Sequence, residues 1–239
     1  LIRSRRRHFS HVPVITVDCG DHVDRMSLET EGSLGKANIA VMNAVGYDLA
    51  APGNNEGLTF TRDALRDMYA KARFPILCCN LTEAGSGQPP DWMRPYHLLE
   101  RDGVRIAFIG ATAPFAAFYR LLGWEVAEPV RAIAAWVERL RGQADIVAVI
   151  SHLGLQTDQY MAETVPGIDL IFGGHTHHLF EQPHKVGETY LFAAGKYGHF
   201  VGEAELVFDR SARRLTEVTG RCLRPDDFAE EIGRASCRE

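Results

Sequence analysis

Short, almost continuously apolar segments alternate along the chain with longer segments that carry apolar residues every three or four positions. The short segments are rich in β-branched residues and end near glycine, proline or charged residues, which predicts buried strands. Such strands are predicted at VPVITVDCG (12–20), YDLAAPG (47–53), FPILCCNL (74–81), ADIVAVISHLG (144–154) and DLIFGG (169–174).

The longer segments predict amphipathic helices between these strands. LGKANIAVMNAV (34–45) stops at Gly46, and TRDALRDMYAKA (61–72) begins at Thr61, a residue type that caps helix N-termini. A short helix is also predicted just before residue 169. The segment PVRAIAAWVERLRGQ (129–143) places four apolar residues on one helix face, namely Ile133, Trp136, Val137 and Leu140.

The remaining segments predict antiparallel strands. Residues 97–112 have the pattern of a β-hairpin that turns at 101–103. From about residue 188 the pattern is mostly strand, in ETYLFAAG, HFVGEAELVFD and RLTEVTGRCL. Alternating strands and helices with nearly continuous apolar strands predict an α/β fold with the helices outside. The strand-rich end predicts either a second sheet packed on the first or an antiparallel extension.

Composition narrows the class of protein. The 239 residues are 46% hydrophobic and 24% charged, which suffices for a full core in one large domain or two small ones. The net charge of −5 and a pI of about 6.1 argue against a binder of nucleic-acid polymers or membrane surfaces. No apolar run approaches the ~18 residues of a membrane span. The one basic run, RSRRRH (3–8), is interpreted as a solvated segment leading into a strand.

Cysteine usage and the chain ends bear on location and domain limits. An odd number of cysteines with an adjacent pair, Cys78 and Cys79, favours a reducing compartment such as the cytoplasm over a disulfide framework. The chain begins at Leu1 just before a predicted strand, and EIGRASCRE (231–239) has no hydrophobic periodicity and looks like a translated sequencing adapter. We therefore expect one domain over residues 1–230 without its first strand, and a non-native segment at 231–239.

Polar side chains of the types that bind metals follow four of the predicted strands. They are Asp21, Asn54, His152 and the pair His175 and His177. The carboxyl ends of strands in α/β sheets are where ligands bind, because the loops there converge over one edge of the sheet. We therefore expect these five residues to share one site.

The ligand types indicate which metal the site suits. A carboxylate, an amide oxygen and three imidazoles, without a thiolate, suit Zn²⁺, Mn²⁺, Fe or Co²⁺ better than Ca²⁺ or a structural zinc finger. Five ligands are more than one open catalytic zinc needs. One carboxylate that bridges two ions would account for the number.

Four sequence blocks together resemble a known family. In order, GDHVDR (20–25), GNNE (53–56), SHLG (151–154) and GGHTHH (173–178) look like the blocks of the calcineurin-like metallophosphoesterases. Within these, the chain is most similar to the bacterial group of 5′-nucleotidases, UDP-sugar hydrolases and 2′,3′-cyclic phosphodiesterases, over about residues 12–220. The resemblance implies a four-layer αββα sandwich with two mixed β-sheets.

Carried over by position, the resemblance implies a role for each ligand. Asp21 would bridge two divalent ions; Asn54, His152 and His175 would complete the second metal site, and His177 would belong to the first. The other ligands of the first site come, in the family, from an Asp-x-His block on a preceding strand, which residues 1–239 do not contain.

Asn55 stands where most of the family has a catalytic histidine. It can donate a hydrogen bond but cannot transfer a proton at neutral pH, although some nucleotidases of the group share the GNNE form. Glu56 is interpreted as a partner that holds the loop, and His178 as a neighbour of phosphate or solvent. Asp24 and Arg25 either orient ligands or form a local salt bridge. Phe172 and Trp136 are interpreted as core residues rather than as a stacking platform.

The implied activity is hydrolysis of a nucleotide phosphate ester through a metal-bridging hydroxide, of the 5′-nucleotidase or cyclic phosphodiesterase type. Asp21 and Asn55 would take part in catalysis, and the partner would be a small phosphate ester rather than a nucleic-acid polymer or a membrane. The alternative is a catalytically impaired relative or inactive fragment that binds metal or nucleotide without turnover, suggested by Asn55 and the missing block. The oligomeric state, the native metal and the exact substrate stay open at this point.

Overall fold

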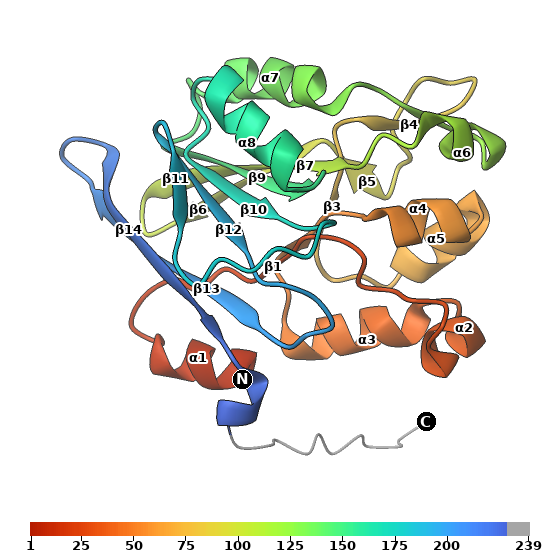
Figure 1. Ribbon diagram of the computed structural model, residues 1–239, viewed down its shortest axis with the longest axis horizontal. Coiled ribbons are helices and arrows are strands. Elements are labelled where there is room, and N and C mark those ends of the chain that lie inside the picture. The colour runs from red at the N-terminus through yellow and green to blue at the C-terminus, as the bar shows by residue number, and fades with distance from the viewer. Residues whose placement is uncertain (229–239) are drawn as a thin grey trace.

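Two β-sheets lie face to face with helices outside them in the computed structural model, which describes residues 1–228 (Figure 1). The larger sheet has the order β11-β12-β10-β9-β7-β6; its inner strands are parallel and both edge strands pair antiparallel. The smaller sheet has the order β1-β2-β3-β5, and all its strands pair in parallel. The predicted α/β sandwich is therefore confirmed, although only the larger sheet is mixed in strand direction.

The strands differ greatly in length between the two sheets. The smaller sheet consists of two-residue strands: β1 (Val17–Asp18), β2 (Leu49–Ala50), β3 (Ile76–Leu77) and β5 (Met93–Arg94). The larger sheet contains β6 (Tyr96–Arg101), β7 (Val104–Thr112), β9 (Ile146–His152), β10 (Leu170–Gly173), β11 (His184–Val186) and β12 (Thr189–Ala193). Two further pairs lie outside the main sheets: β4 (Leu81–Glu83) with β8 (Trp124–Val126), and β13 (Val201–Asp209) with β14 (Arg214–Leu223).

The α-helices of residues 1–228 lie around the two sheets. They are α1 (Ile2–His8), α2 (Leu28–Ser33), α3 (Lys36–Val45), α4 (Asn54–Thr59), α5 (Arg62–Tyr69), α6 (Ala116–Leu121), α7 (Pro129–Leu140) and α8 (Leu155–Thr164), with a 3₁₀ turn at Pro225–Asp227. The predicted helices at 34–45, 61–72 and 129–143 correspond to α3, α5 and α7. The predicted stop and start residues take these roles. Gly46 ends α3 with a φ of 89°, and the Thr61 side chain accepts a hydrogen bond from the Ala64 N–H at the start of α5.

Three apolar layers hold the sandwich together. Between the sheets, Leu49 and Leu77 of the smaller sheet pack with Phe108 and Ile150 of the larger one. Side chains of α3 and α5 fill the layer outside the smaller sheet, and side chains of α7 and α8 fill the layer outside the larger sheet. On α7 the predicted face is buried at Ile133, Val137 and Leu140, with Trp136 partly buried beside them.

The predicted hairpin at 97–112 is confirmed as β6 and β7. These strands pair from Tyr96 with Ile109 to Arg101 with Val104, so the turn is the two residues Asp102 and Gly103. Both have positive φ, 50° and 73°, which matches the twist that a two-residue hairpin needs.

The N-terminal basic run differs from its prediction. It forms helix α1, and its arginines bind carboxylates of distant segments instead of lying free in solvent before a strand. Arg5 pairs with Glu203 at 2.6 Å, and Arg6 pairs with Asp48 at 2.6 Å. These contacts tie α1 both to the β13–β14 pair and to the start of β2.

None of the helices within residues 1–228 is long and apolar enough to cross a membrane. The expectation that 231–239 is non-native, and the domain limit at residue 230, fall on residues outside those that the structure describes.

Candidate metal centre

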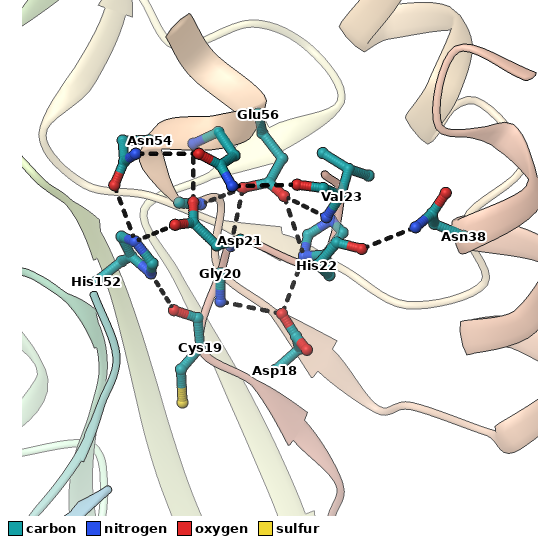
Figure 2. Close-up of polar contacts among 12 residues, drawn as sticks. Asp18, Cys19, Gly20, Asp21, His22, Val23, Asn38, Asn54, Glu56 and His152 are labelled. Carbon is teal, nitrogen blue, oxygen red and sulfur yellow. Dashed lines mark hydrogen bonds and ion pairs between the residues drawn. The ribbon is translucent and has the colours of Figure 1, made fainter. Parts of the chain in front are cut away.

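Loops from both sheets meet at one point and bring three predicted ligands together. Asp21 follows β1, His152 is the last residue of β9, and His175 lies two residues beyond β10. One ligand atom from each of these residues lies within 4.8 Å of the others. Asn54, the first residue of α4, joins them through its Oδ1, which lies 3.2 Å from His152 Nε2. The structure therefore gathers four of the five predicted ligands (Figure 2 labels three of them).

His152 presents one ring nitrogen to the centre of this group. Its Nδ1 donates to the carbonyl oxygen of Cys19 at 2.7 Å, so its Nε2 faces the oxygens of Asp21 and Asn54, each at 3.2 Å (Figure 2). A histidine that donates one N–H to a backbone carbonyl and points the other nitrogen at oxygen ligands has the usual arrangement of a metal ligand. A carboxylate, an amide oxygen and two imidazoles fit a divalent transition metal or zinc by donor chemistry.

The charges of the group are coupled. Burial alone would lower the pKa of His152, but its hydrogen bond to Asp21 and the charge of that carboxylate raise it above the usual value. Burial raises the pKa of Asp21, but its bond to His152, the charge of that ring and the Asn55 N–H together lower the pKa below its usual value. His175 has a lowered pKa because of its burial and the nearby His152. The carboxylate of Asp21 thus favours a positive charge at this point of the structure.

His177 and Asn55 lie beside this group rather than in it. His177 is exposed and its ring lies 6.5 Å from that of Tyr197, so the structure leaves it outside the cluster of three. The Asn55 backbone N–H donates to Asp21 Oδ1 at 2.8 Å, and its side-chain Nδ2 donates to the Val23 carbonyl at 3.4 Å.

Glycine is required where the two ligand loops touch. A Cβ at Gly53 would lie 2.1 Å from Asp21 Oδ1, and a Cβ at Gly20 would lie 2.6 Å from the Gly53 nitrogen. Gly20 also has a φ of 91°, in the left-handed region that favours glycine. Close approach of the two backbones is what sets Asp21 beside Asn54.

Glu56 connects the two loops through its carboxylate. Its side chain is fully buried and accepts backbone N–H groups from both loops: Asp21 at 3.0 Å, Gly53 at 2.6 Å and Val23 at 2.9 Å (Figure 2). This geometry agrees with the predicted loop-holding role. It also explains how a negatively charged side chain is accommodated inside the protein.

A buried group around His22 was not predicted. His22 Nδ1 lies 2.9 Å from Asp18 Oδ1, its Nε2 lies 3.0 Å from the Tyr69 hydroxyl, and its side chain is 4% exposed. Burial lowers the pKa of His22, but the charges of Glu56 and Asp18 raise it to about 9. The four-residue spacing of Asp18, at the end of a predicted strand, and His22, in the first block, was the signal available in the sequence.

Three other residues named in the sequence analysis form contacts with nearby side chains. Arg25 pairs with Glu31 at 2.5 Å, so the local salt bridge forms. His178 Nδ1 bonds the Thr176 hydroxyl at 2.9 Å. Phe172 stacks on Phe192 and packs against the core between the sheets, as predicted.

Comparisons with known proteins place the chain among its relatives. The model of a family described as "Bacterial capsule synthesis protein PGA_cap" matches residues 21–191. An uncharacterized metallophosphoesterase of Bacillus subtilis, YunD, is 40% identical over 219 residues, which cover 91% of this chain and 47% of that protein. A 2′,3′-cyclic-nucleotide 2′-phosphodiesterase/3′-nucleotidase of Yersinia enterocolitica is 33% identical over 162 residues, which cover 58% of this chain and 24% of that protein.

Solved structures share the fold. The sulfate thiohydrolase SoxB of Thermus thermophilus superposes with a TM-score of 0.83 at 25% identity, covering 93% of this chain and 41% of that one. Further homologues include 5′-nucleotidases. The chain spans about half or less of the length of these proteins. The chain therefore belongs to the family of the matching model and, with its nucleotidase and cyclic phosphodiesterase homologues, to the calcineurin-like metallophosphoesterases.

Proposed function

We propose that this protein hydrolyses phosphate esters of nucleotides at a divalent metal ion held by Asp21, Asn54, His152 and His175. The observation that carries the proposal is the approach of Asp21, His152 and His175, from three separate segments, to within 4.8 Å of one another. An ion bound there would polarise a phosphoryl oxygen and lower the pKa of water, which is the chemistry that ester hydrolysis needs. Relatives named as nucleotidases support the choice of substrate.

The side chains around the ion have separate tasks in this proposal. Asn55 cannot move a proton, so its amide serves as a hydrogen-bond donor to a phosphoryl oxygen. The 3.4 Å bond of its Nδ2 to the Val23 carbonyl is long, and a substrate oxygen can replace it at little cost. The Cys19 carbonyl fixes the His152 ring, and the buried Glu56 fixes the backbone of Asp21.

A second ion is the finer part of the proposal. Asp21 would bridge the two ions and His177 would bind the second one, together with further ligands that the resemblance assigns to an Asp-x-His block outside residues 1–239. We therefore expect these residues to bind one equivalent of Mn²⁺ tightly and a second weakly. Titration calorimetry with metal-free protein tests this expectation, and His177→Ala is expected to remove only the weak equivalent.

The main test compares two aspartates of the same loop. Wild-type protein loaded with Mn²⁺ or Zn²⁺ is assayed for phosphate release from AMP and 2′,3′-cyclic AMP, beside Asp21→Asn and Asp24→Asn. Asp24 is an exposed neighbour whose side chain accepts the Met26 N–H at 2.9 Å. We expect Asp21→Asn to lower kcat/KM by more than about 100-fold and to release the tight ion, with Asp24→Asn unchanged. Absence of hydrolysis by the loaded wild type, or full activity of Asp21→Asn, contradicts the proposal.

A further inference from the structure

An aromatic side chain stands at the edge of the candidate metal centre. Phe115 precedes α6, and its ring centroid lies 5.8 Å from that of His175 in an edge-to-face arrangement. It remains 37% exposed although it is a large apolar residue. A ring in this position faces both a proposed metal ligand and solvent, so it can contact the organic part of a bound phosphate ester.

The helix that follows Phe115 packs against α4, the helix that carries Asn54. Four residues further along, Tyr119 is fully buried, and its hydroxyl lies 3.2 Å from the Thr112 hydroxyl. Tyr119 packs against α4, the helix that begins at Asn54. A Cβ at Gly57 of that helix would lie 2.5 Å from Tyr119 Cε1, so glycine allows the close contact. The helix that follows Phe115 is therefore packed against the helix that begins at Asn54.

A second aromatic residue near the site is less suited to this role. Tyr197 lies beside His177, but it is 76% exposed and its ring is already contacted by the Lys196 ammonium at 4.7 Å. His177 itself lies outside the cluster of Asp21, His152 and His175. Phe115, by contrast, is partly buried and adjacent to that cluster.

We propose that Phe115 is a specificity-determining residue, whose ring stacks on the base of a nucleotide while the phosphate lies at the metal centre. The site then prefers a ribose phosphate that carries a base over the same ester without one. This inference rests on the proposed function of the same site. Stacking of a base on an aromatic side chain changes affinity by roughly 5- to 150-fold.

The test uses two substrates that differ only in the base, AMP and ribose 5-phosphate. In the metal-loaded full chain, we expect Phe115→Ala to lower kcat/KM for AMP by about 10-fold and to leave that for ribose 5-phosphate within about 2-fold. Phe115→Tyr keeps the ring and is expected to keep the preference. Phe118→Ala is the matched control, because Phe118 is a phenylalanine three residues further along, inside α6, and is 62% exposed.

A binding measurement accompanies the kinetics. Calorimetric titration with a non-hydrolysable phosphonate analogue of AMP is expected to give a Kd about 10-fold weaker for Phe115→Ala. The inference is overturned if Phe115→Ala lowers kcat/KM equally for both substrates or changes it for neither. It is also overturned if Phe118→Ala or Tyr197→Ala lowers kcat/KM for AMP instead. If wild type hydrolyses neither ester and does not bind the analogue, the proposed function fails and this inference fails with it.

Discussion

Replacing Glu56 by glutamine tests how the Asp21 loop is held. The two oxygens of Glu56 accept three backbone N–H groups: Oε2 accepts those of Asp21 and Gly53, and Oε1 accepts that of Val23. Glutamine has nearly the same shape but only one oxygen. In its better orientation the amide oxygen takes the Oε2 position, and the Val23 N–H then faces an NH₂ group. The variant loses one charge-assisted hydrogen bond and leaves one buried N–H without an acceptor, which together lower the unfolding free energy by about 2–4 kcal/mol.

The assay is urea unfolding of the metal-free protein, followed by circular dichroism, with the slope of the transition checked for constancy. Glu31→Gln is the matched control, because Glu31 pairs with Arg25 at the surface, where both side chains are more than 40% exposed. We expect its unfolding midpoint to stay at the wild-type value. Metal affinity should fall by about 10- to 100-fold in Glu56→Gln alone. Equal midpoints for the two variants would refute the idea that Glu56 holds the loops.

Three smaller predictions concern single contacts. Burial raises the pKa of Asp158 to about 7, so the folded protein loses stability as the pH rises from about 4 to 7. In urea unfolding, the unfolding free energy of Asp158→Asn should therefore rise by about 3 kcal/mol relative to that of wild type between pH 5 and pH 8. The same difference between the two proteins at both pH values would contradict this. Thr61→Ala removes the cap that bonds the Ala64 N–H and should cost about 1 kcal/mol in the same assay. Gly57→Ala forces a Cβ to within 2.5 Å of Tyr119 and should cost about 1–3 kcal/mol.

The sequence predicted the longer elements and missed the short ones for a physical reason. Helix α7 spans twelve residues, enough for its apolar face to repeat. Helices α1, α2, α4 and α6 have six or seven residues, fewer than two full turns, so no periodicity can stand out. The predicted strand at 12–20 shrinks to Val17–Asp18 because strand length depends on which neighbour pairs with it.

The candidate site also has a part that the sequence predicted and a part that it did not. Asp21, Asn54, His152 and His175 were predicted together because each follows a strand, and strand ends converge by topology. The contact of His22 with Tyr69 joins residues 47 positions apart through a ring nitrogen and a hydroxyl. Strand order does not dictate such a side-chain contact. It depends on how α5 packs over the smaller sheet.

Three of the predicted ligands have a left-handed backbone conformation. Asp21, His175 and His177 have φ values of 58°, 71° and 58°, in the left-handed region that costs a residue with a side chain about 1–2 kcal/mol. Glycine would remove this cost, as it does at the neighbouring Gly20, but glycine has no ligand atom. At Asp21 the bond from its N–H to the buried Glu56 helps to offset the cost. Glycine is the residue that the local backbone favours at these three places, and we propose that ligand chemistry is the reason for the aspartate and histidine found there.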